Sequence, residues 1–127
     1  MINFEKWHGN GNDFVIINSI EQSIKLKKSF IKKISDRNKG IGFDQLIVIG
    51  LPTKYEHDFF VRFYNSDSSE ANMCLNGIRC ASSYVWKNSL APMKKIFFKT
   101  KHVDIKCFPE NNKYVSVIIK KPKDIQN

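Results

Sequence analysis

The sequence predicts an α+β domain in which a curved, barrel-like sheet wraps around one buried central helix. Short apolar runs of strand length recur along the chain, and one longer helical pattern is apolar enough to be buried among them. The aromatic share is 13%, with ten phenylalanines, which suits packing between strands. Because many strands then share a single central helix, we expect the sheet to curl around it.

In the first half of the chain, candidate strands are separated by turns rich in glycine and asparagine. The first segment, residues 2–7, alternates in polarity. Residues 14–17 and 46–49 are continuous apolar runs, and residues 59–64 are mostly apolar. Residues 9–12 form a loop, because glycine and asparagine tolerate positive φ. Apolar residues at roughly helical spacing among lysines predict a helix over 24–36.

The second half contains the central helix and the last strands. The helix predicted over 76–88 has one apolar face, formed by Ile78, Ala81, Tyr84 and Val85. A break follows at 88–92, where Pro92 prevents the helix from continuing. Three further runs of strand length, at 96–99, 103–108 and 114–119, complete the predicted sheet.

Length and composition describe a single globular domain spanning residues 1–127. The chain is 42% hydrophobic and 26% charged, which excludes disorder, and no apolar run approaches the ~18 residues of a membrane span. No signal-peptide pattern occurs at the start, so we expect a cytoplasmic protein without a membrane partner. Three cysteines, an odd number, argue against a disulfide framework and fit a reducing compartment.

The net charge of +9 raises the question of nucleic-acid binding. The positive surplus is mostly lysine and lies within residues 20–40 and 91–127, outside the segments that carry the motifs described below. Only three arginines occur, and aromatic residues do not alternate with them as stacking on bases would require. This distribution favours a solvated lysine surface over a polyanion-binding face, and we predict no nucleic-acid partner.

The sequence also lacks the common metal and cofactor motifs. No Cys-x-x-Cys or His-x-x-x-His pair is present, so no structural metal site is predicted. Gly9 and Gly11 do not form a dinucleotide fingerprint, because no helix follows them and the third glycine is absent. No lysine lies in a motif that would hold pyridoxal phosphate. We therefore predict a protein that works without a cofactor or metal.

The most informative single residue is Cys74, which precedes a Leu75–Gly77 turn and the predicted central helix. The first amides of a helix point outward with unpaired hydrogens and can hold a carboxylate. The same partial positive charge favours a thiolate over a thiol. A base beside an anion cradle is what proton chemistry at the α-carbon of an amino acid requires.

Residues 7–18, 40–49 and 65–80 together resemble the N-terminal half of diaminopimelate epimerase. The specific features are His-Gly-x-Gly-Asn-Asp-Phe in the first segment and Cys-x-Asn-Gly-x-Arg-Cys in the third. The resemblance implies one lobe of a fold in which two such lobes face each other across a cleft. It also implies a cofactor-independent epimerase that converts LL-diaminopimelate to meso-diaminopimelate, on the route to lysine and peptidoglycan.

The resemblance assigns site residues position by position. Cys74 matches one of the family's two catalytic cysteines. The matching substrate-binding positions are Asn12, Gln45, Asn65 and Asn76. Leu75 departs from the pattern, because the family usually has glycine after the catalytic cysteine. Its amide can still bind the substrate, but a left-handed backbone there would cost about 1–2 kcal/mol.

The implied mechanism needs a second cysteine, because one side chain cannot easily reach both faces of a stereocentre. In the family this cysteine lies in the C-terminal lobe, and Cys80 and Cys107 are predicted to be core or surface residues instead. We therefore expect a chain that lacks the C-terminal lobe, is inactive alone, and acts on a small amino acid, with homodimers possible by analogy. The alternative is a non-catalytic remnant or binding module of the same fold, which Leu75 and the short chain favour.

Overall fold

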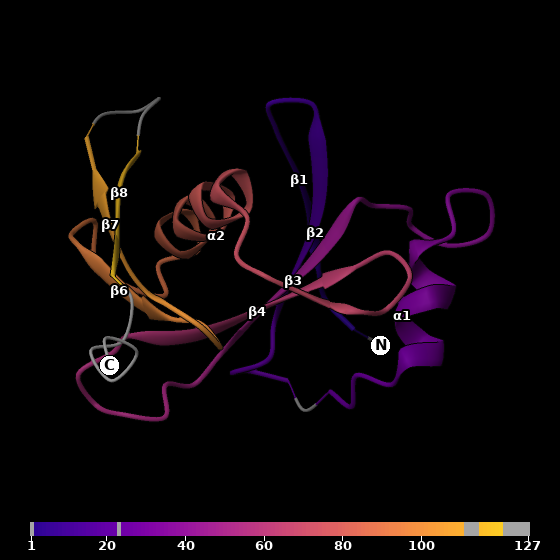
Figure 1. Ribbon diagram of the computed structural model, residues 1–127, viewed down its shortest axis with the longest axis horizontal. Coiled ribbons are helices and arrows are strands. Elements are labelled where there is room, and N and C mark those ends of the chain that lie inside the picture. The colour runs from indigo at the N-terminus through magenta and orange to yellow at the C-terminus, as the bar shows by residue number, and fades with distance from the viewer. Residues whose placement is uncertain (1, 23, 111–114, 121–127) are drawn as a thin grey trace, which may run out of the picture.

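The structure, a computed structural model, describes residues 2–22, 24–110 and 115–120 (Figure 1). These residues form one eight-stranded sheet and two helices. The strands are β1 (Glu5–Gly9), β2 (Asn12–Asn18), β3 (Gln45–Gly50), β4 (Phe59–Asn65), β5 (Glu70–Ala71), β6 (Ile96–Lys99), β7 (Asp104–Pro109) and β8 (Val115–Lys120). The helices are α1 (Lys28–Ser35) and α2 (Leu75–Lys87).

The sheet curls around α2, as the sequence predicts, and α1 lies on its outer side (Figure 1). The strand order is β1-β2-β3-β4-β6-β7-β8, with β5 beside β4. Neighbouring strands are antiparallel except in the pairs β2–β3 and β4–β6, which are parallel. Each parallel pair is separated in the chain by a helix, because parallel neighbours need a long crossover connection.

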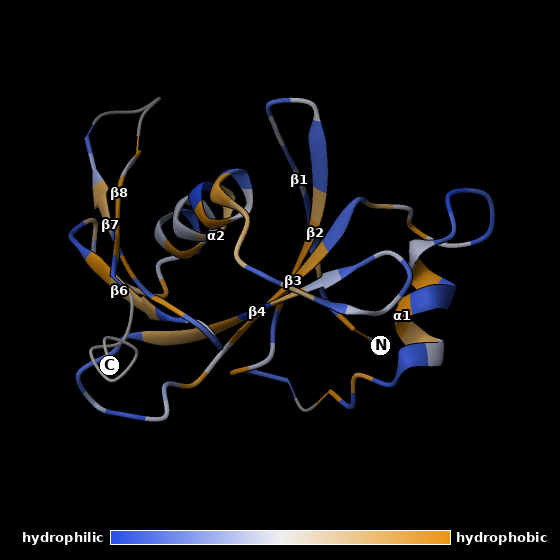
Figure 2. Ribbon diagram, in the orientation of Figure 1, coloured by the Kyte–Doolittle hydropathy of each residue, from blue (hydrophilic) through white to orange (hydrophobic). Residues whose placement is uncertain are grey.

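Both faces of β2 and β3 are buried, which explains why these strands are continuously apolar. Successive side chains of a strand point to opposite faces. Phe14 and Ile16, with Ile47 and Ile49, pack on the side of α2, and Val15, Ile17, Leu46 and Val48 pack on the side of α1. Figure 2 shows hydrophobic colour along the central strands and hydrophilic colour at the loop after α1. The sheet therefore separates two apolar clusters.

The first strand lies at Glu5–Gly9 and not at the predicted residues 2–7. Its position is set by a two-residue turn, Asn10-Gly11, in which both residues have positive φ, 50° and 85°. This turn pairs Gly9 with Asn12 and Glu5 with Ile16, so the ladder ends before the first residues of the chain. Asn3 instead exchanges two hydrogen bonds with Gln22. The turn therefore determines where the first strand lies, and the alternation of polarity in residues 2–7 does not.

The first helix is shorter than the predicted 24–36 and covers only Lys28–Ser35. Lys27, the N-cap residue, has extended backbone, and no side chain caps the helix there. Ile24 and Leu26 nevertheless pack against the cluster on the α1 side of the sheet. These two residues are apolar because they are buried within an extended segment. Their spacing only resembles that of a helix.

The remaining elements lie within one or two residues of their predicted positions. The predicted strand at 114–119 corresponds to β8, and its first residue, Tyr114, lies outside the described residues. The sequence does not predict β5, because two residues are too few to show a periodicity. Neither of the two described helices has the length and apolarity that crossing a membrane would require.

Ile78→Ala is expected to lower the free energy of unfolding by about 2–5 kcal/mol, because this fully buried side chain packs between α2 and the sheet. Leu75→Ala is the control on the same helix and is expected to cost under about 1 kcal/mol, because Leu75 is 41% exposed. Urea unfolding followed by circular dichroism measures both. Equal losses in the two variants would contradict the packing of α2.

Candidate active site

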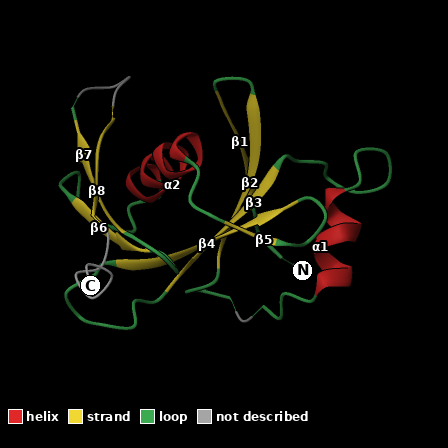
Figure 3. Cartoon of the chain, viewed as in Figure 1, coloured by secondary structure: helices red, strands yellow, loops and turns green. Residues whose placement is uncertain are grey.

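Cys74 lies in the link between β5 and α2 and is the N-cap residue of α2 (Figure 3). Its backbone is extended, with φ −109° and ψ 126°, and its carbonyl oxygen accepts the Ile78 amide hydrogen at 2.9 Å. The side chain makes no capping hydrogen bond, and the residue is half-buried. The thiol therefore lies at the positive end of the helix without a structural bond that occupies it.

The first turn of α2 presents backbone amides next to this thiol. The N–H groups of Leu75, Asn76 and Gly77 donate to no acceptor within the described ranges, as is usual for the first residues of an α-helix. No acidic side chain lies in this turn to compete for them. An anion placed here would meet free donors and the positive end of the helix dipole.

Leu75 fits this position without backbone strain. It is the first residue of α2, so the predicted turn at Leu75–Gly77 is already helical. In the described part of the chain, positive φ occurs in non-glycine residues only at Asn10, Ser68 and Ser89. A glycine is therefore not required after Cys74, and the cost of a left-handed leucine does not arise. The leucine side chain is 41% exposed and adds bulk at the edge of the amides.

Gly77 brings this turn of α2 against the sheet. A Cβ atom at Gly77 would lie 3.1 Å from Phe63 Cε2, 3.3 Å from Ile47 Cδ1 and 3.4 Å from Phe14 Cε1. These three side chains belong to β4, β3 and β2. Two residues along the same strands, and so on the same face, lie the predicted site residues Asn65, Gln45 and Asn12. The sheet therefore places all three on the face that receives the start of α2.

Gln45 and Asn65 are in direct contact. They are register partners on β3 and β4, and Gln45 Nε2 donates to Asn65 Oδ1 at 3.2 Å. Asn65 Nδ2 donates in turn to Ser69 Oγ at 3.1 Å. Gln45 Oε1 is buried and has no hydrogen-bond partner among the residues described. A buried acceptor without a donor is costly, so this atom is suited to accept from a bound ligand.

Asn76 connects the start of α2 to the β1–β2 hairpin. Its Oδ1 accepts from Asn10 Nδ2 at 3.1 Å, across 66 residues of sequence. Gly9 allows the close approach, because a Cβ atom there would lie 3.3 Å from Cys80 Sγ. A pocket of about 400 Å³ opens beside this contact and is lined by residues that include Asn76 and Cys80. Of the candidate site residues, only Asn76 lines this pocket.

Asn12 is held by a charged network that the sequence did not predict. Its Nδ2 lies 3.5 Å from Asp44 Oδ2, and the Asp44 amide donates to Asp13 Oδ1 at 2.8 Å. Arg37 binds both Asp13 oxygens, at 2.9 and 3.0 Å, and Asp44 Oδ1 at 3.1 Å. Because Asp13 follows Asn12 and Asp44 precedes Gln45, this network positions two candidate site residues. One indication of this role was present in the sequence, since Asp13 and Asp44 are neighbours of Asn12 and Gln45 in the chain.

The hydrogen bonds from Arg37 hold the pKa of the Asp13 carboxyl well below its usual range, against the opposing effect of burial. The ionised Asp13 therefore contributes stability that is complete above the unfolded pKa, about 4, and is lost as pH falls toward the depressed folded value.

Arg37→Gln is expected to lower the unfolding temperature at about pH 7 and to reduce the loss between about pH 7 and pH 3, because it removes the main cause of the shift. Lys39→Gln removes a nearby charge that makes no ion pair within the described ranges, and is the control. Calorimetry at the two pH values measures the difference. An acid loss as steep in Arg37→Gln as in the parent chain would contradict the role of this network.

The other two cysteines are core residues, as predicted. Cys80 is 7% exposed, and burial, with the nearby Cys74 charge, raises the pKa of its thiol to about 11. Cys107 is fully buried, and burial raises the pKa of its thiol to about 12. Both are therefore protonated at neutral pH and unsuited to act as a base. Cys74 is the one cysteine of the three that solvent reaches appreciably.

Iodoacetamide at about pH 8 is expected to alkylate Cys74 at least about tenfold faster than Cys80 or Cys107, because only thiolate reacts and the buried thiols remain protonated. Mass spectrometry of peptides from the folded chain measures the three rates. Cys74→Ser should abolish the fast phase, and Cys80→Ser should leave it intact. Comparable labelling of all three cysteines would contradict this assignment.

The described residues contain no group of three or more histidine, cysteine, aspartate or glutamate side chains placed to hold a metal ion. The groups brought together are a thiol, helix amides and neutral amide side chains. Amide groups both donate and accept hydrogen bonds, so such groups are suited to a zwitterion.

Comparison with known proteins identifies the sequence family. The family model described as diaminopimelate epimerase matches residues 4–123. A diaminopimelate epimerase of Psychrobacter sp. (strain PRwf-1) is 39% identical over 123 residues, 97% of this chain and 42% of the relative. A diaminopimelate epimerase of Wigglesworthia glossinidia brevipalpis is 43% identical over 121 residues, 94% of this chain and 44% of the relative. The chain thus spans less than half the length of these relatives.

Solved structures show the same fold at low sequence identity. A methylitaconate-delta-isomerase matches with a TM-score of 0.64 and 15% identity, over 87% of this chain and 60% of that protein. A Bacillus anthracis phenazine biosynthesis protein of the PhzF family matches with a TM-score of 0.58 and 15% identity, over 91% of this chain and 38% of that protein. With the family model covering residues 4–123 and these relatives aligned along the chain, this protein belongs to the diaminopimelate epimerase family.

Proposed function

We propose that this chain supplies one wall of the active site of a cofactor-independent epimerase that converts LL-diaminopimelate to meso-diaminopimelate. The observation that carries the proposal is the half-buried Cys74 thiol at the N-terminus of α2, beside three free backbone amides. We infer the substrate from the name of the relatives, diaminopimelate epimerase. In the proposal this chain contributes the base and the anion site. The reaction supplies precursors of lysine and peptidoglycan, and the thiolate it needs persists in a reducing cytoplasm.

In the proposed step, the Cys74 thiolate removes the α-proton of the bound amino acid and becomes a thiol. The electron pair of the broken C–H bond passes into the substrate carboxylate, which the amides of Leu75, Asn76 and Gly77 stabilise as its charge increases. A second thiol then returns a proton to the opposite face of the carbon. After one turnover Cys74 is a thiol and the second sulfur is a thiolate, and proton exchange with solvent restores the starting forms. In the reverse direction the two sulfurs exchange roles.

The substrate ammonium needs acceptors on the same face of the sheet. Gln45 Oε1 is buried without a partner among the described residues, and Asn65 Oδ1 lies beside it as the acceptor of Gln45 Nε2. We assign these two oxygens to the ammonium group, and Asn12 and Asn76 to the edges of the substrate. These side chains are neutral amides that both donate and accept hydrogen bonds, which suits a substrate that carries charges of both signs.

The three cysteines of these 127 residues are Cys74, Cys80 and Cys107, so the second sulfur must come from a segment that is not among them or from another polypeptide. Cys80 and Cys107 are buried, with thiols whose pKa values are raised to about 11 and about 12. The relatives are more than twice as long as the matched region, so the proposal places this sulfur in a second lobe. The 127-residue chain should then bind substrate weakly and not epimerise it. A homodimer, which the resemblance also implies, would be formed with that lobe present.

The competing function is a non-catalytic binding module, which Leu75 favours because its exposed side chain narrows the approach to the amides. The two functions differ in what they require of Cys74. A binding module tolerates replacement of the sulfur, whereas an epimerase does not.

The test combines the chain with the C-terminal part of the Wigglesworthia relative in deuterated water. Deuterium incorporation at the α-carbon and conversion of LL- to meso-diaminopimelate are expected, with no incorporation by the 127-residue chain alone. Cys74→Ser should lower the rate of incorporation by about 10²–10⁴-fold, because the general base is removed. NMR and chiral chromatography measure the two products.

Cys80→Ser is the matched control and should retain the activity. Alkylation of Cys74 by an aziridine analogue of diaminopimelate in the combined protein would further support the proposal. Incorporation by the 127-residue chain alone would contradict the need for a second lobe. A combined protein that neither turns over nor is labelled at Cys74 would sink the proposal and favour the binding module.

A further inference from the structure

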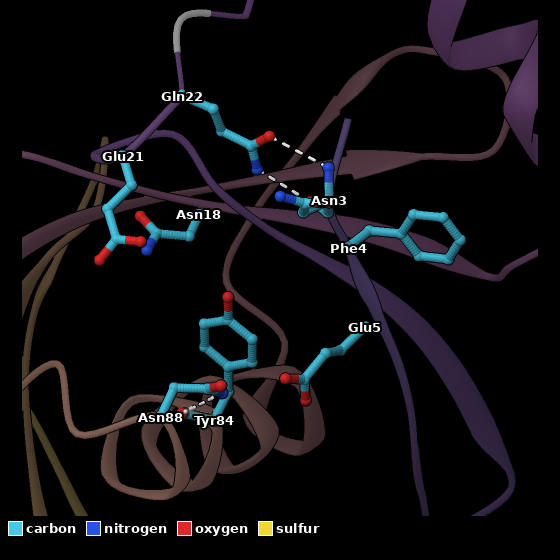
Figure 4. Close-up of a pocket in the computed structure, with 8 residues that line it drawn as sticks. All are labelled: Asn3, Phe4, Glu5, Asn18, Glu21, Gln22, Tyr84 and Asn88. Carbon is cyan, nitrogen blue, oxygen red and sulfur yellow. Dashed lines mark hydrogen bonds between the residues drawn. The ribbon is translucent and has the colours of Figure 1, made fainter. Parts of the chain in front are cut away.

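A second pocket lies at the opposite end of α2 from Cys74. It has a volume of about 240 Å³ and is enclosed by the segment before β1, the loop after β2 and the last turn of α2 (Figure 4). The fourteen residue steps from Cys74 to Asn88 correspond to about 21 Å along the helix axis. The pocket is thus separate from the candidate active site, and the proposed epimerase reaction does not use it.

Two deeply buried side chains turn polar atoms into this pocket. Asn18 is 6% exposed, and its Oδ1 accepts from the Ile20 amide at 2.9 Å, which leaves Nδ2 without an acceptor in the described part of the chain. Tyr84 is 7% exposed, and its hydroxyl also has no hydrogen-bond partner among those residues. Figure 4 shows this hydroxyl pointing from α2 toward Asn18. Neither atom is one of the fully buried polar atoms that lack a partner, so both reach the open space of the pocket and can bind a ligand there.

The charge of the pocket is negative although the chain as a whole is strongly basic. Its described lining contains Glu5 and Glu21 and no lysine or arginine. Glu5 is already engaged, by Lys87 Nζ at 3.1 Å and Trp7 Nε1 at 2.9 Å, whereas Glu21 forms no ion pair with any described residue. Burial, followed by the negative charges of Glu5 and Glu21, raises the pKa of Tyr84. A cation would offset this field.

Hydrogen bonds connect residues at the rim of the pocket. Gln22 Oε1 accepts from the Asn3 amide at 3.0 Å, and Gln22 Nε2 donates to the Asn3 carbonyl at 2.8 Å. On the helix side, Asn88 Nδ2 donates to the Tyr84 carbonyl at 2.9 Å (Figure 4). These bonds hold the wall residues in place before any ligand enters. A preformed site loses little conformational entropy on binding.

We propose that this pocket binds a small primary amine in its ammonium form, with a hydroxyl or carbonyl oxygen close to the ammonium group. Glu21 is the counter-ion, and the Tyr84 hydroxyl oxygen accepts a second ammonium hydrogen. Asn18 Nδ2 donates to the neighbouring oxygen of the ligand. This arrangement gives a partner to Glu21, to the Tyr84 hydroxyl and to Asn18 Nδ2. The volume suits a molecule of a few non-hydrogen atoms.

Titration of the ¹⁵N-labelled 127-residue chain tests the proposal by NMR. Three probes of equal size separate the contribution of the ammonium charge from that of the oxygen. Ethanolammonium has both the charge and an oxygen, n-propylammonium has only the charge, and ethylene glycol has only oxygens. Ethanolammonium is expected to shift the Asn18 side-chain NH₂ signals saturably. The other two should bind at least about tenfold more weakly, as loss of a charge-assisted or a buried hydrogen bond predicts.

Variants separate this site from a general attraction of cations to carboxylates. Glu21→Gln should weaken ethanolammonium binding at least about tenfold, and Tyr84→Phe severalfold. Glu56→Gln removes an equal charge from an exposed residue that makes no ion pair with any residue described, and should change nothing. Equal affinity for ethanolammonium and ethylene glycol, or an unchanged affinity in Glu21→Gln, would overturn the proposal.

A lysine side chain from a second copy could present the same ammonium chemistry, and dilution distinguishes this source. If the Asn18 signals shift on dilution without added amine, a lysine of another copy already occupies the pocket, and the small-ligand assignment is wrong. Signals that are independent of protein concentration, together with saturation by ethanolammonium, support it.

Discussion

The approach of Cys74 and the free amides to the polar side chains of the strands depends on the close contact between the first turn of α2 and the sheet. Gly77 makes this contact possible, because its missing side chain lets the helix backbone approach Phe63, Ile47 and Phe14. A helix held further from the sheet would move Cys74 and the free amides away from the polar side chains on the strands. The same contact buries Ile78 and joins the site to the apolar core. Packing and chemistry thus share one interface.

The polar side of that interface is held by charge. Asp13 and Asp44 stand beside Asn12 and Gln45 in the chain, and each carboxylate accepts the backbone amide of the other residue. Arg37, from the segment after α1, binds both carboxylates and offsets their mutual repulsion. The chelated arrangement is stronger than an isolated surface ion pair, because one guanidinium fork and two backbone donors act together. It anchors two parallel strands at the edge of the sheet that carries the site.

The two ends of α2 differ in electrostatic character. At the N-terminal end the amides of the first turn are free and no carboxylate lies in that turn, so an anion is favoured. At the C-terminal end Glu5 and Glu21 line a pocket without lysine or arginine in its described lining, so a cation is favoured. A net charge of +9 describes neither place. Charge averaged over a chain predicts nonspecific attraction, whereas binding depends on the few groups that face one cavity.

The sequence by itself determined the curled sheet, the buried helix and the place of Cys74 at its start. Continuous apolar runs such as Phe14–Ile17, and the motif around Cys74, are local patterns. Local patterns predict local structure, because they depend on residues that are close in the chain. The clamp of Arg37 on Asp13 and Asp44, the contact of Asn10 with Asn76 and the pocket between Asn18 and Tyr84 were decided only by the tertiary structure. Their members are 7 to 66 residues apart in sequence. The register of the strands and the helical crossovers between them bring these residues together. The periodicity of the sequence predicts neither the register nor the crossovers.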